Sequence, residues 1–262
     1  MTKFKGKAIY QPSGKAEEYA KWACNFYVGC SNDCTYCYCK KGILAGVMGQ
    51  DKPQLKKCFY DEVHAFNVFN NEVFKNSKEI KKHGIFFSFT TDPMLPETID
   101  LTLMAADAAI YQDIPVKILT KMANWDEWIP VRNREMYAFG FTLTGHDELE
   151  LGASTNQERI EAMKRLHNAG FKTFASIEPI IDFPSSRNMI ESTLGFCDLY
   201  KVGLMSGKKY DVVDAQTFVE RLNNISKMPK IYLKESLQKL THYTNGELDI
   251  NFVNSDYNIF QP

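Results

Sequence analysis

The sequence lacks any apolar run long enough to cross a membrane. None of its 262 residues belongs to an uninterrupted stretch of about 18 apolar side chains. Residues 1–7 are polar and rich in lysine, and the apolar core of a secretory signal does not follow them. We therefore expect a cytoplasmic protein with no membrane association.

The sequence also lacks an excess of either charge. It contains 31 Lys and Arg against 32 Asp and Glu, for a formal net charge of −1. A protein that coats nucleic acid is usually strongly basic, so any contact with nucleic acid must be local. Low-complexity segments and repeats of fixed period are absent as well. With 44% hydrophobic and 24% charged residues, this composition excludes disorder and fits a single domain over residues 1–262.

The cysteine content does not resemble a secreted disulfide framework. There are seven cysteines, an odd number, and six of them lie in the span from Cys24 to Cys58. In a reducing compartment, such a group indicates metal binding or catalysis.

Short β-branched and aromatic runs alternate with amphipathic helical stretches along the chain. The expected strands cover residues 22–28, 85–90, 116–120, 138–143, 173–177, 199–203 and 230–233. The expected helices cover residues 60–77, 97–111, 124–131, 156–169, 186–195 and 215–226. This alternation predicts an α/β fold with parallel strands and right-handed crossovers. A full or partial TIM-type barrel is the preferred architecture, and a doubly wound open sheet is the alternative.

Polar pairs stand at the ends of several of these strands. Barrels of this kind place their chemistry at the carboxyl ends of the strands, and residues two apart share a face. Such pairs indicate a polar barrel mouth, although strand ends are also polar simply because they meet water. The pairs are Ser88 with Thr90, Thr142 with Thr144, and Ser176 with Glu178.

Three cysteines form the motif Cys-x3-Cys-x2-Cys at Cys30, Cys34 and Cys37. Three thiolates on a short loop can bind three irons of a [4Fe–4S] cubane, which leaves the fourth iron without a protein ligand. The amino and carboxylate groups of S-adenosylmethionine (SAM) can occupy that open position, and the cofactor then carries radical chemistry. Tyr36, directly before the last cysteine, is a candidate neighbour of the adenine.

Zinc is the main alternative for this motif. Cys39, Cys24 or Cys58 could complete a four-thiolate site, but zinc sites more often pair two Cys-x2-Cys units and only one is present. We interpret Cys39 as a non-ligand. Cys24, Cys58 and Cys197 are interpreted as buried small residues.

At these residues the sequence resembles the radical SAM superfamily, and within it the branch related to spore photoproduct lyase. The cysteine motif, with an aromatic residue before its third cysteine, carries the resemblance to the superfamily. Further matching segments are short, are spread over most of the chain and point to the lyase-like branch. They are residues 9–20, 25–30, 34–38, 91–93, 118–121, 176–182 and 200–203.

The resemblance implies a (β/α)6-type partial barrel. Residues 1–20 would be an N-terminal extension, residues 21–205 the barrel core, and residues 206–262 a C-terminal strand and helices that close the barrel. It also implies a [4Fe–4S] cluster, SAM, and an electron donor such as flavodoxin or ferredoxin. We expect a monomer. Two other classes remain open, a cluster- and SAM-binding regulatory protein without turnover and a ferredoxin-like electron carrier.

The resemblance also implies which residues meet SAM. Related enzymes often have a Gly-Gly-Glu segment near the end of the second strand. This chain has Phe-Thr-Thr-Asp at residues 89–92 instead, so Thr90 and Asp92 would take the place of that segment. Lys121 could reach the SAM carboxylate. The alternative for each residue is a solvated strand end. The full set expected to bind SAM is Tyr36, Tyr38, Ser88, Thr90, Asp92, Thr142, Thr144, Ser176 and Gly203, with Lys121 and Glu178 beside the cysteines in the catalytic group.

A polar set at the barrel mouth is expected to handle substrate. Its lysines could meet an anionic group such as phosphate. The members are Asp92, Lys121, Glu178, Lys201 and Lys234.

The resemblance points less directly to a substrate. The lyases carry a hydrogen-donating cysteine before a Thr-x-Asp segment, whereas Phe89 stands there in this chain. Cys197, Tyr38 or Cys39 could substitute for it. We therefore expect a substrate other than the spore photoproduct. A nucleotide, nucleic acid or peptide all remain open, with nucleic acid favoured and with residues 207–209 and 3–15 as a local basic rim.

Overall fold

The computed structural model describes residues 3–43, 45–125, 133–226 and 229–261. Its main sheet has eight strands in the order β1-β2-β5-β6-β7-β8-β9-β10. Only the β1–β2 pair is antiparallel, and the neighbouring pairs from β2 to β10 are all parallel. The strands are β1 (Ile9–Tyr10), β2 (Ala23–Cys24), β5 (Ile85–Phe87), β6 (Val116–Thr120), β7 (Tyr137–Thr142), β8 (Lys172–Ile180), β9 (Leu199–Leu204) and β10 (Lys230–Leu233).

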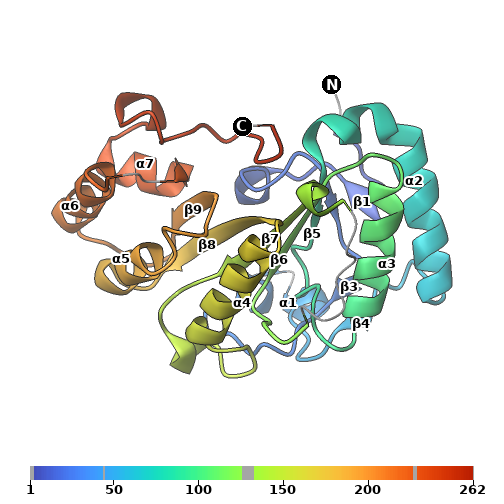
Figure 1. Cartoon of the computed structure of the whole chain (residues 1–262). Coiled ribbons are helices and arrows are strands. Elements are labelled where there is room, and N and C mark those ends of the chain that lie inside the picture. Colours follow the sequence, from blue (N-terminus) through green and yellow to red (C-terminus); the bar gives the residue numbers. More distant parts are fainter. Residues whose placement is uncertain (1–2, 44, 126–132, 227–228, 262) are drawn as a thin grey trace.

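Helices connect the parallel strands and cover one side of the sheet (Figure 1). They are α2 (Glu62–His83), α3 (Ile99–Ile110), α4 (Asn156–Asn168), α5 (Phe183–Glu191), α6 (Val212–Asn223) and α7 (Glu235–Thr241). Local sequence explains several helix starts. The side chains of Asp61, Asp182 and Asp211 accept backbone N–H groups of the first turn, and Thr155 forms a capping box with Glu158.

Shorter elements surround this framework. A second sheet pairs β3 (Tyr27–Val28) with β4 (Gln54–Leu55), and α1 (Ala45–Met48) lies between them in sequence. The 3-10 helices are η1 (Gly14–Ala16), η2 (Tyr38–Lys40), η4 (Arg134–Met136), η5 (Asp147–Leu149) and η6 (Asn245–Glu247).

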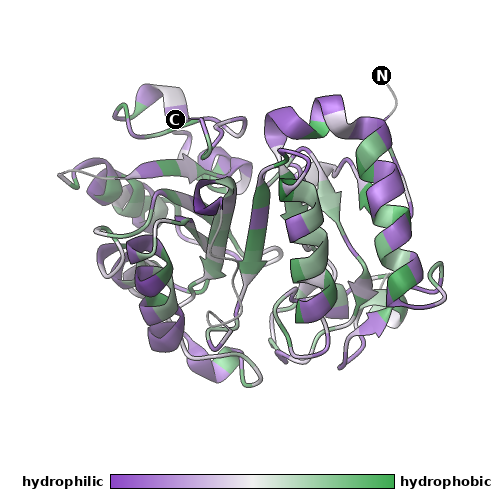
Figure 2. Ribbon diagram, turned by 45° about the vertical axis from the view of Figure 1, so that its right-hand side comes forward, coloured by the Kyte–Doolittle hydropathy of each residue, from purple (hydrophilic) through white to green (hydrophobic). Residues whose placement is uncertain are grey.

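Alternation along the strands divides the core into two layers. In β6, Val116 and Ile118 pack into the large cluster formed with the helices, whereas Leu119 belongs to a second cluster on the other face. Figure 2 shows the same division, with mostly hydrophobic strands and helices that carry one hydrophilic side. The helices thus bury the outer face of the sheet, and the inner face needs another cover.

The two ends of the chain supply that cover. Tyr19 and Ala20 from the N-terminal segment pack in the inner cluster with Ile259 from the C-terminal tail. Phe86 and Phe174 contribute from the sheet. Figure 1 shows the blue N-terminal segment and the red tail close together over the strands. We call the space between the inner face and these two segments the lumen.

Most predicted elements are confirmed, with shifted boundaries. Residues 116–120 and 230–233 form strands with the predicted bounds. The strand predicted at residues 22–28 is wrong as one element, because it divides into β2 and β3 at Asn25. The Asn25 backbone N–H donates to the Ala8 carbonyl, its side chain accepts the Phe89 N–H, and the chain then leaves the main sheet. The helix predicted at residues 124–131 lies largely outside the described residues.

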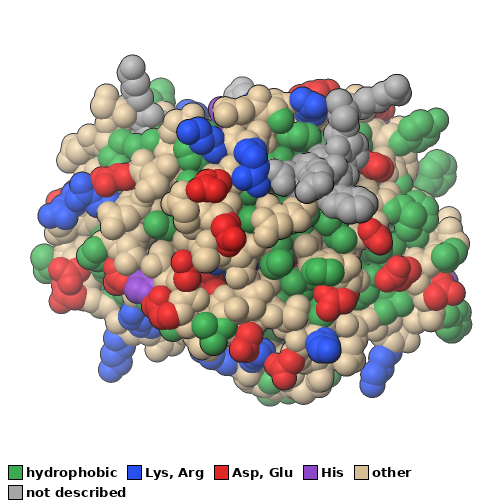
Figure 3. Space-filling model, turned by 60° about the horizontal axis from the view of Figure 1, so that its bottom comes forward, with side chains coloured by type: hydrophobic (Ala, Val, Ile, Leu, Met, Phe, Trp, Pro, Cys, Tyr) green, Lys and Arg blue, Asp and Glu red, His purple; other side chains and the backbone are tan. Residues whose placement is uncertain are grey.

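The predicted partial barrel is confirmed as an α/β fold with β1 and β10 at the two ends of the sheet order. In the described part of the chain, no helix has the length and apolar character needed to span a bilayer. On the face shown in Figure 3, basic and acidic side chains are interleaved.

Candidate functional site

The three motif cysteines lie on a short loop that follows β3 and ends at η2. Cys30 and Cys37 are half-buried, Cys34 is buried, and all three thiols are free. The loop is held from two sides. The Cys30 N–H donates to the Gln50 carbonyl at 3.0 Å, and the Thr35 N–H donates to the Leu149 carbonyl at 3.0 Å. Backbone contacts from distant segments therefore define the shape of this loop.

The segment between β7 and α4 packs directly against the cysteine loop. The Gly152 N–H donates to the Asn32 carbonyl at 3.0 Å. A Cβ at Gly152 would lie 2.0 Å from the Ser31 carbonyl oxygen, which is closer than atoms can approach. Glycine is thus required here because the two backbones touch.

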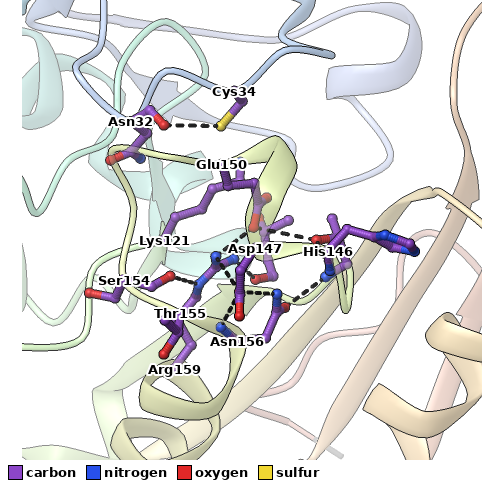
Figure 4. A network of polar contacts seen from close by, with 12 residues as sticks. Asn32, Cys34, Lys121, His146, Asp147, Glu150, Ser154, Thr155, Asn156 and Arg159 are labelled. Atoms are coloured by element: carbon purple, nitrogen blue, oxygen red, sulfur yellow. Dashed lines mark hydrogen bonds and ion pairs between the residues drawn. The ribbon is translucent and has the colours of Figure 1, made fainter.

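Glu150 is the centre of a buried polar network beside this contact (Figure 4). Its carboxylate lies 2.5 Å from the Arg159 guanidinium, and neither side chain is exposed. The Tyr36 hydroxyl donates to the same carboxylate, and the Thr144 hydroxyl donates at 3.3 Å. Glu150 therefore connects the motif residue Tyr36 to helix α4.

Arg159 is fully buried, and each nitrogen of its guanidinium has a hydrogen-bond acceptor. In addition to Glu150, it donates to the carbonyls of Thr142 and Ser154, each at 2.7 Å. The sequence reasoning missed both members of this pair. One signal existed, because Arg159 lies four residues before Met163 on the buried stripe of α4, where a charge needs a buried partner.

Asp92 is a second anchor of the cysteine loop. Its buried carboxylate accepts four hydrogen bonds, from the Asn32 amide at 2.7 Å, the Thr120 hydroxyl at 2.6 Å, the Lys121 N–H at 2.7 Å and the Met94 N–H at 3.0 Å. Asn32 stands between the first two motif cysteines. Asp92 thus links the loop to the carboxyl end of β6 and has its oxygens engaged within the protein.

Lys121 supplies positive charge next to the cysteines. Its ammonium lies 5.5 Å from the centre of the Tyr36 ring. Burial opposes the charged form, but the neighbouring Cys34 and Glu150 raise the pKa of Lys121. The lysine therefore stays protonated at neutral pH.

The motif thiols differ in acidity. Burial raises the pKa of Cys30 to about 12. A hydrogen bond from Cys39 outweighs burial at Cys37 and lowers its pKa to about 6. Cys37 is thus the most acidic of the thiols whose pKa is shifted here, and thiolate is the form in which cysteine binds metal.

Phe89 and its sequence neighbours Ser88 and Thr90 lie beside the cysteine loop and are held by hydrogen bonds. The Tyr38 hydroxyl donates to the Phe89 carbonyl, and the Cys39 sulfur lies 3.7 Å from the same oxygen. Ser88 donates to the Thr91 carbonyl at 2.7 Å, and Thr90 donates to a carbonyl of β3 at 2.6 Å.

Glu178 belongs to a different network, inside the lumen. Its carboxylate pairs with the Lys234 ammonium at 2.5 Å and accepts the Tyr19 hydroxyl at 2.9 Å. Tyr19 also shares a hydrogen bond of 2.6 Å with Ser176. A Cβ at Gly203 would lie 2.9 Å from the Glu178 carboxylate, so this glycine leaves room for the pair.

The predicted site residues therefore separate into two groups. Around the cysteine loop lie Tyr36, Tyr38, Ser88, Thr90, Asp92, Lys121, Thr142 and Thr144. In the lumen lie Ser176, Glu178, Lys201, Gly203 and Lys234. Cys197 is in neither group, because its buried thiol donates to the Leu199 carbonyl at the start of β9.

The lumen group includes two residues that sequence reasoning assigned no role. The Tyr232 hydroxyl donates to the Glu18 carboxylate at 2.8 Å, and Tyr19 is the central hydrogen-bonding partner of Ser176 and Glu178. Glu18 and Tyr19, the two residues without an assigned role, both come from the N-terminal segment and lie more than 150 residues away from these partners in the sequence. That separation removes any local pattern that could have revealed them.

The donor set of the cysteine loop fits an iron–sulfur cluster. Soft thiolates suit its irons, and Lys121 offsets the negative charge that three thiolates bring. Across the described ranges, no three His, Cys, Asp or Glu side chains are gathered around one point as a single metal ion requires. A cubane makes a different demand, since each thiolate binds a separate iron.

Comparison with known proteins gives one family match and several fold matches. A family model of the radical SAM superfamily matches residues 24–197. A comparison with curated proteins finds no match. Spore photoproduct lyase complexed with dinucleoside spore photoproduct is similar in fold, with a TM-score of 0.56, 17% identity and coverage of 84% of this chain.

A second fold match is Streptococcus suis SuiB bound to precursor peptide SuiA. It has a TM-score of 0.54, 14% identity and coverage of 88% of this chain. The chain spans only 64% of the lyase and 47% of SuiB. At these identities the likeness shows a shared fold.

Proposed function

This chain belongs to the radical SAM superfamily and is an enzyme, and we propose that Cys30, Cys34 and Cys37 hold a [4Fe–4S] cluster at which SAM is reductively cleaved. The observation that carries the proposal is the cysteine loop, which two buried anchors, Glu150 and Asp92, hold beside the carboxyl ends of the parallel strands. When bound, cluster and SAM together supply a 5′-deoxyadenosyl radical that abstracts a hydrogen atom from substrate.

The residues around the loop have separate tasks in this proposal. Lys121 binds the SAM carboxylate, because its ammonium is the positive group next to the motif thiols. Tyr36 presents its ring to the adenine while Glu150 holds its hydroxyl. Asp92 acts as a positioning residue, since four internal donors already occupy its oxygens.

The lumen network contributes the remaining polar groups. Ser176 and Glu178 lie on the inner face of β8, where Tyr19 and Lys234 hold them in place. We assign Glu178 and Lys234 to the substrate side of the site. The electron that starts the reaction comes from a partner such as flavodoxin or ferredoxin.

The proposed substrate is a nucleic acid component other than the spore photoproduct. Phe89 lacks the weak X–H bond of a hydrogen donor, but the Cys39 thiol lies 3.7 Å from its carbonyl. Cys39 is therefore our preferred hydrogen donor, ahead of Cys197, which is buried elsewhere at the start of β9.

Reductive SAM cleavage is the direct test of this function. Protein reconstituted with iron and sulfide under anaerobic conditions, and then reduced, should release 5′-deoxyadenosine from SAM. The Lys121→Met variant should bind SAM more weakly and form less product, whereas the exposed-residue control Lys164→Met should match the native protein. Binding of SAM without any cleavage would instead support a regulatory protein.

The substrate is tested with reduced enzyme, SAM and oligonucleotides. We expect the enzyme to abstract deuterium from a deuterated nucleic acid, which would place the label in 5′-deoxyadenosine. A deuterated peptide should give no labelled 5′-deoxyadenosine. Repair of a dimer-containing oligonucleotide over many turnovers would contradict the assignment of another substrate. Deuterium transfer from a peptide alone would exclude the nucleic acid.

A further inference from the structure

Lys117, Lys201 and Lys234 lie at the lumen and differ in their partners. Lys234 pairs with Glu178 at 2.5 Å and with Glu18 at 3.4 Å. Lys117 on β6 and Lys201 on β9 have no carboxylate within 4.0 Å among the residues that the structure describes. Neither ammonium group therefore forms a direct ion pair, and Glu18 and Glu178 act on Lys201 only from a greater distance.

Backbone oxygens take the place of carboxylates at these two lysines. Lys201 donates to the Glu18 carbonyl at 2.5 Å and to the Tyr19 carbonyl at 3.4 Å. Lys117 donates to the His83 carbonyl at 3.3 Å. Each ammonium has three N–H groups, so both retain capacity for a further acceptor.

Aromatic rings also face the two ammonium groups. Lys201 lies 5.3 Å from the centre of the Tyr19 ring and 5.5 Å from that of Tyr232, and Lys117 lies 5.8 Å from that of Phe260. Such rings attract a cation, but they carry no net charge. Neither ammonium group thus has a carboxylate in direct contact among the described residues.

Both lysines line the same small cavity. Its volume is about 10 Å³, close to the space that one water molecule needs. Tyr19 from the N-terminal segment and Tyr257 and Ile259 from the C-terminal tail also line it. The cavity therefore contains the ammonium-bearing side chains of one buried and one half-buried lysine and is otherwise walled by aromatic and aliphatic side chains, with no acidic residue in its lining.

Burial disfavours the protonated, charged forms of Lys117 and Lys201. Burial lowers the pKa of Lys117 to about 8. Burial, followed by repulsion from Lys117 and Lys234, lowers the pKa of Lys201 well below its ordinary value, although attraction by Glu18 and Glu178 opposes the shift. A negative charge between the two ammonium groups would remove both the repulsion and part of the desolvation cost.

We propose that this cavity binds one small monovalent anion, of the size of chloride, between the ammonium groups of Lys117 and Lys201. The anion would connect β6 and β9 with the N-terminal segment and the C-terminal tail, and so stabilise the cover of the lumen. The proposal does not depend on radical chemistry, because the cavity is lined by the first residues of β8 and β9, at the opposite end of the strands from the cysteine loop.

Thermal unfolding of the full chain in sodium bromide, compared with sodium gluconate at equal ionic strength, tests the site. Bromide is close to chloride in size, whereas gluconate is far too large for the cavity. We expect the Tm of the native protein to rise by about 3–6 °C for each tenfold increase of bromide beyond its dissociation constant. The Lys117→Met and Lys201→Met variants should lose this dependence, and the exposed Lys164→Met control should keep it.

A crystal structure of the native protein in bromide provides the second measurement, which does not require any variant to fold. The expected result is an anomalous bromide peak between the two ammonium groups. Equal Tm values of the native protein in bromide and gluconate, or a cavity without a bromide peak, would overturn the proposal.

Discussion

The Glu150–Arg159 pair allows the sharpest prediction about how the cysteine loop is held. Replacing Glu150 by Gln keeps the size of the side chain and an acceptor for Tyr36, but it removes the charge that compensates Arg159. Both side chains have 0% exposure and lie 2.5 Å apart, so water cannot replace the lost partner. Asp147, at 4.0 Å, is the other acid near the guanidinium.

The magnitude follows from this geometry. Removing one member of a buried ion pair costs about 3–5 kcal/mol, and the remaining interaction with Asp147 favours the lower end, about 3 kcal/mol. Glu148 offers a matched control, because its side chain is 67% exposed and its ion pair is with the imidazole of His146. Glu148→Gln should change the free energy of unfolding by less than about 0.5 kcal/mol.

Urea unfolding of the iron-free protein, followed by circular dichroism, measures both variants without a contribution from bound metal. Arg159→Met should be similarly destabilising, since it leaves the Glu150 carboxylate buried and unpaired. The double variant Glu150→Gln with Arg159→Met should lose less stability than the sum of the single variants. A loss below about 1 kcal/mol for Glu150→Gln, or strict additivity, would refute the reasoning.

Three further predictions concern other contacts. Asp92→Asn turns an amide N–H toward groups that already donate, so the free energy of unfolding should fall by about 1.5–3 kcal/mol and the reconstituted protein should retain less iron. Gly152→Ala should separate two backbones in contact and also lower iron retention, whereas Gly195→Ala, where the added Cβ meets no atom, should not lower it. In gluconate, the free energy of unfolding of the native protein minus that of the Lys117→Met variant should rise between pH 8 and pH 10.5. The unfolded lysine binds more protons than the folded one over that interval, and a flat difference would contradict the buried charge.

Local patterns were sufficient for much of the fold. The runs at residues 116–120 and 230–233 became strands with the expected bounds, because their β-branched and aromatic residues favour strands. The start predicted for the helix at residues 156–169 is likewise confirmed, since Thr155 caps α4 directly before Asn156. The cysteine motif and the polar strand ends also followed from spacing alone.

The remaining features depend on contacts between distant segments. Nothing near Asn25 signals that the chain leaves the main sheet there, since its partners are Ala8 and Phe89. The same holds for Tyr19, which reaches Glu178 across 159 positions. Sequence periodicity describes the face of one element, but it does not identify which distant side chain covers that face.

Iron content tests the central claim most directly. Protein reconstituted and purified without oxygen should contain about four irons per chain and should show the electron paramagnetic resonance signal of a reduced [4Fe–4S] cluster after reduction. The triple variant of Cys30, Cys34 and Cys37 to Ala should lose both the iron and the signal, while Cys197→Ala, which removes a buried thiol outside the loop, should keep them. Native protein that carries only zinc, or a triple variant that keeps its iron, would contradict the account.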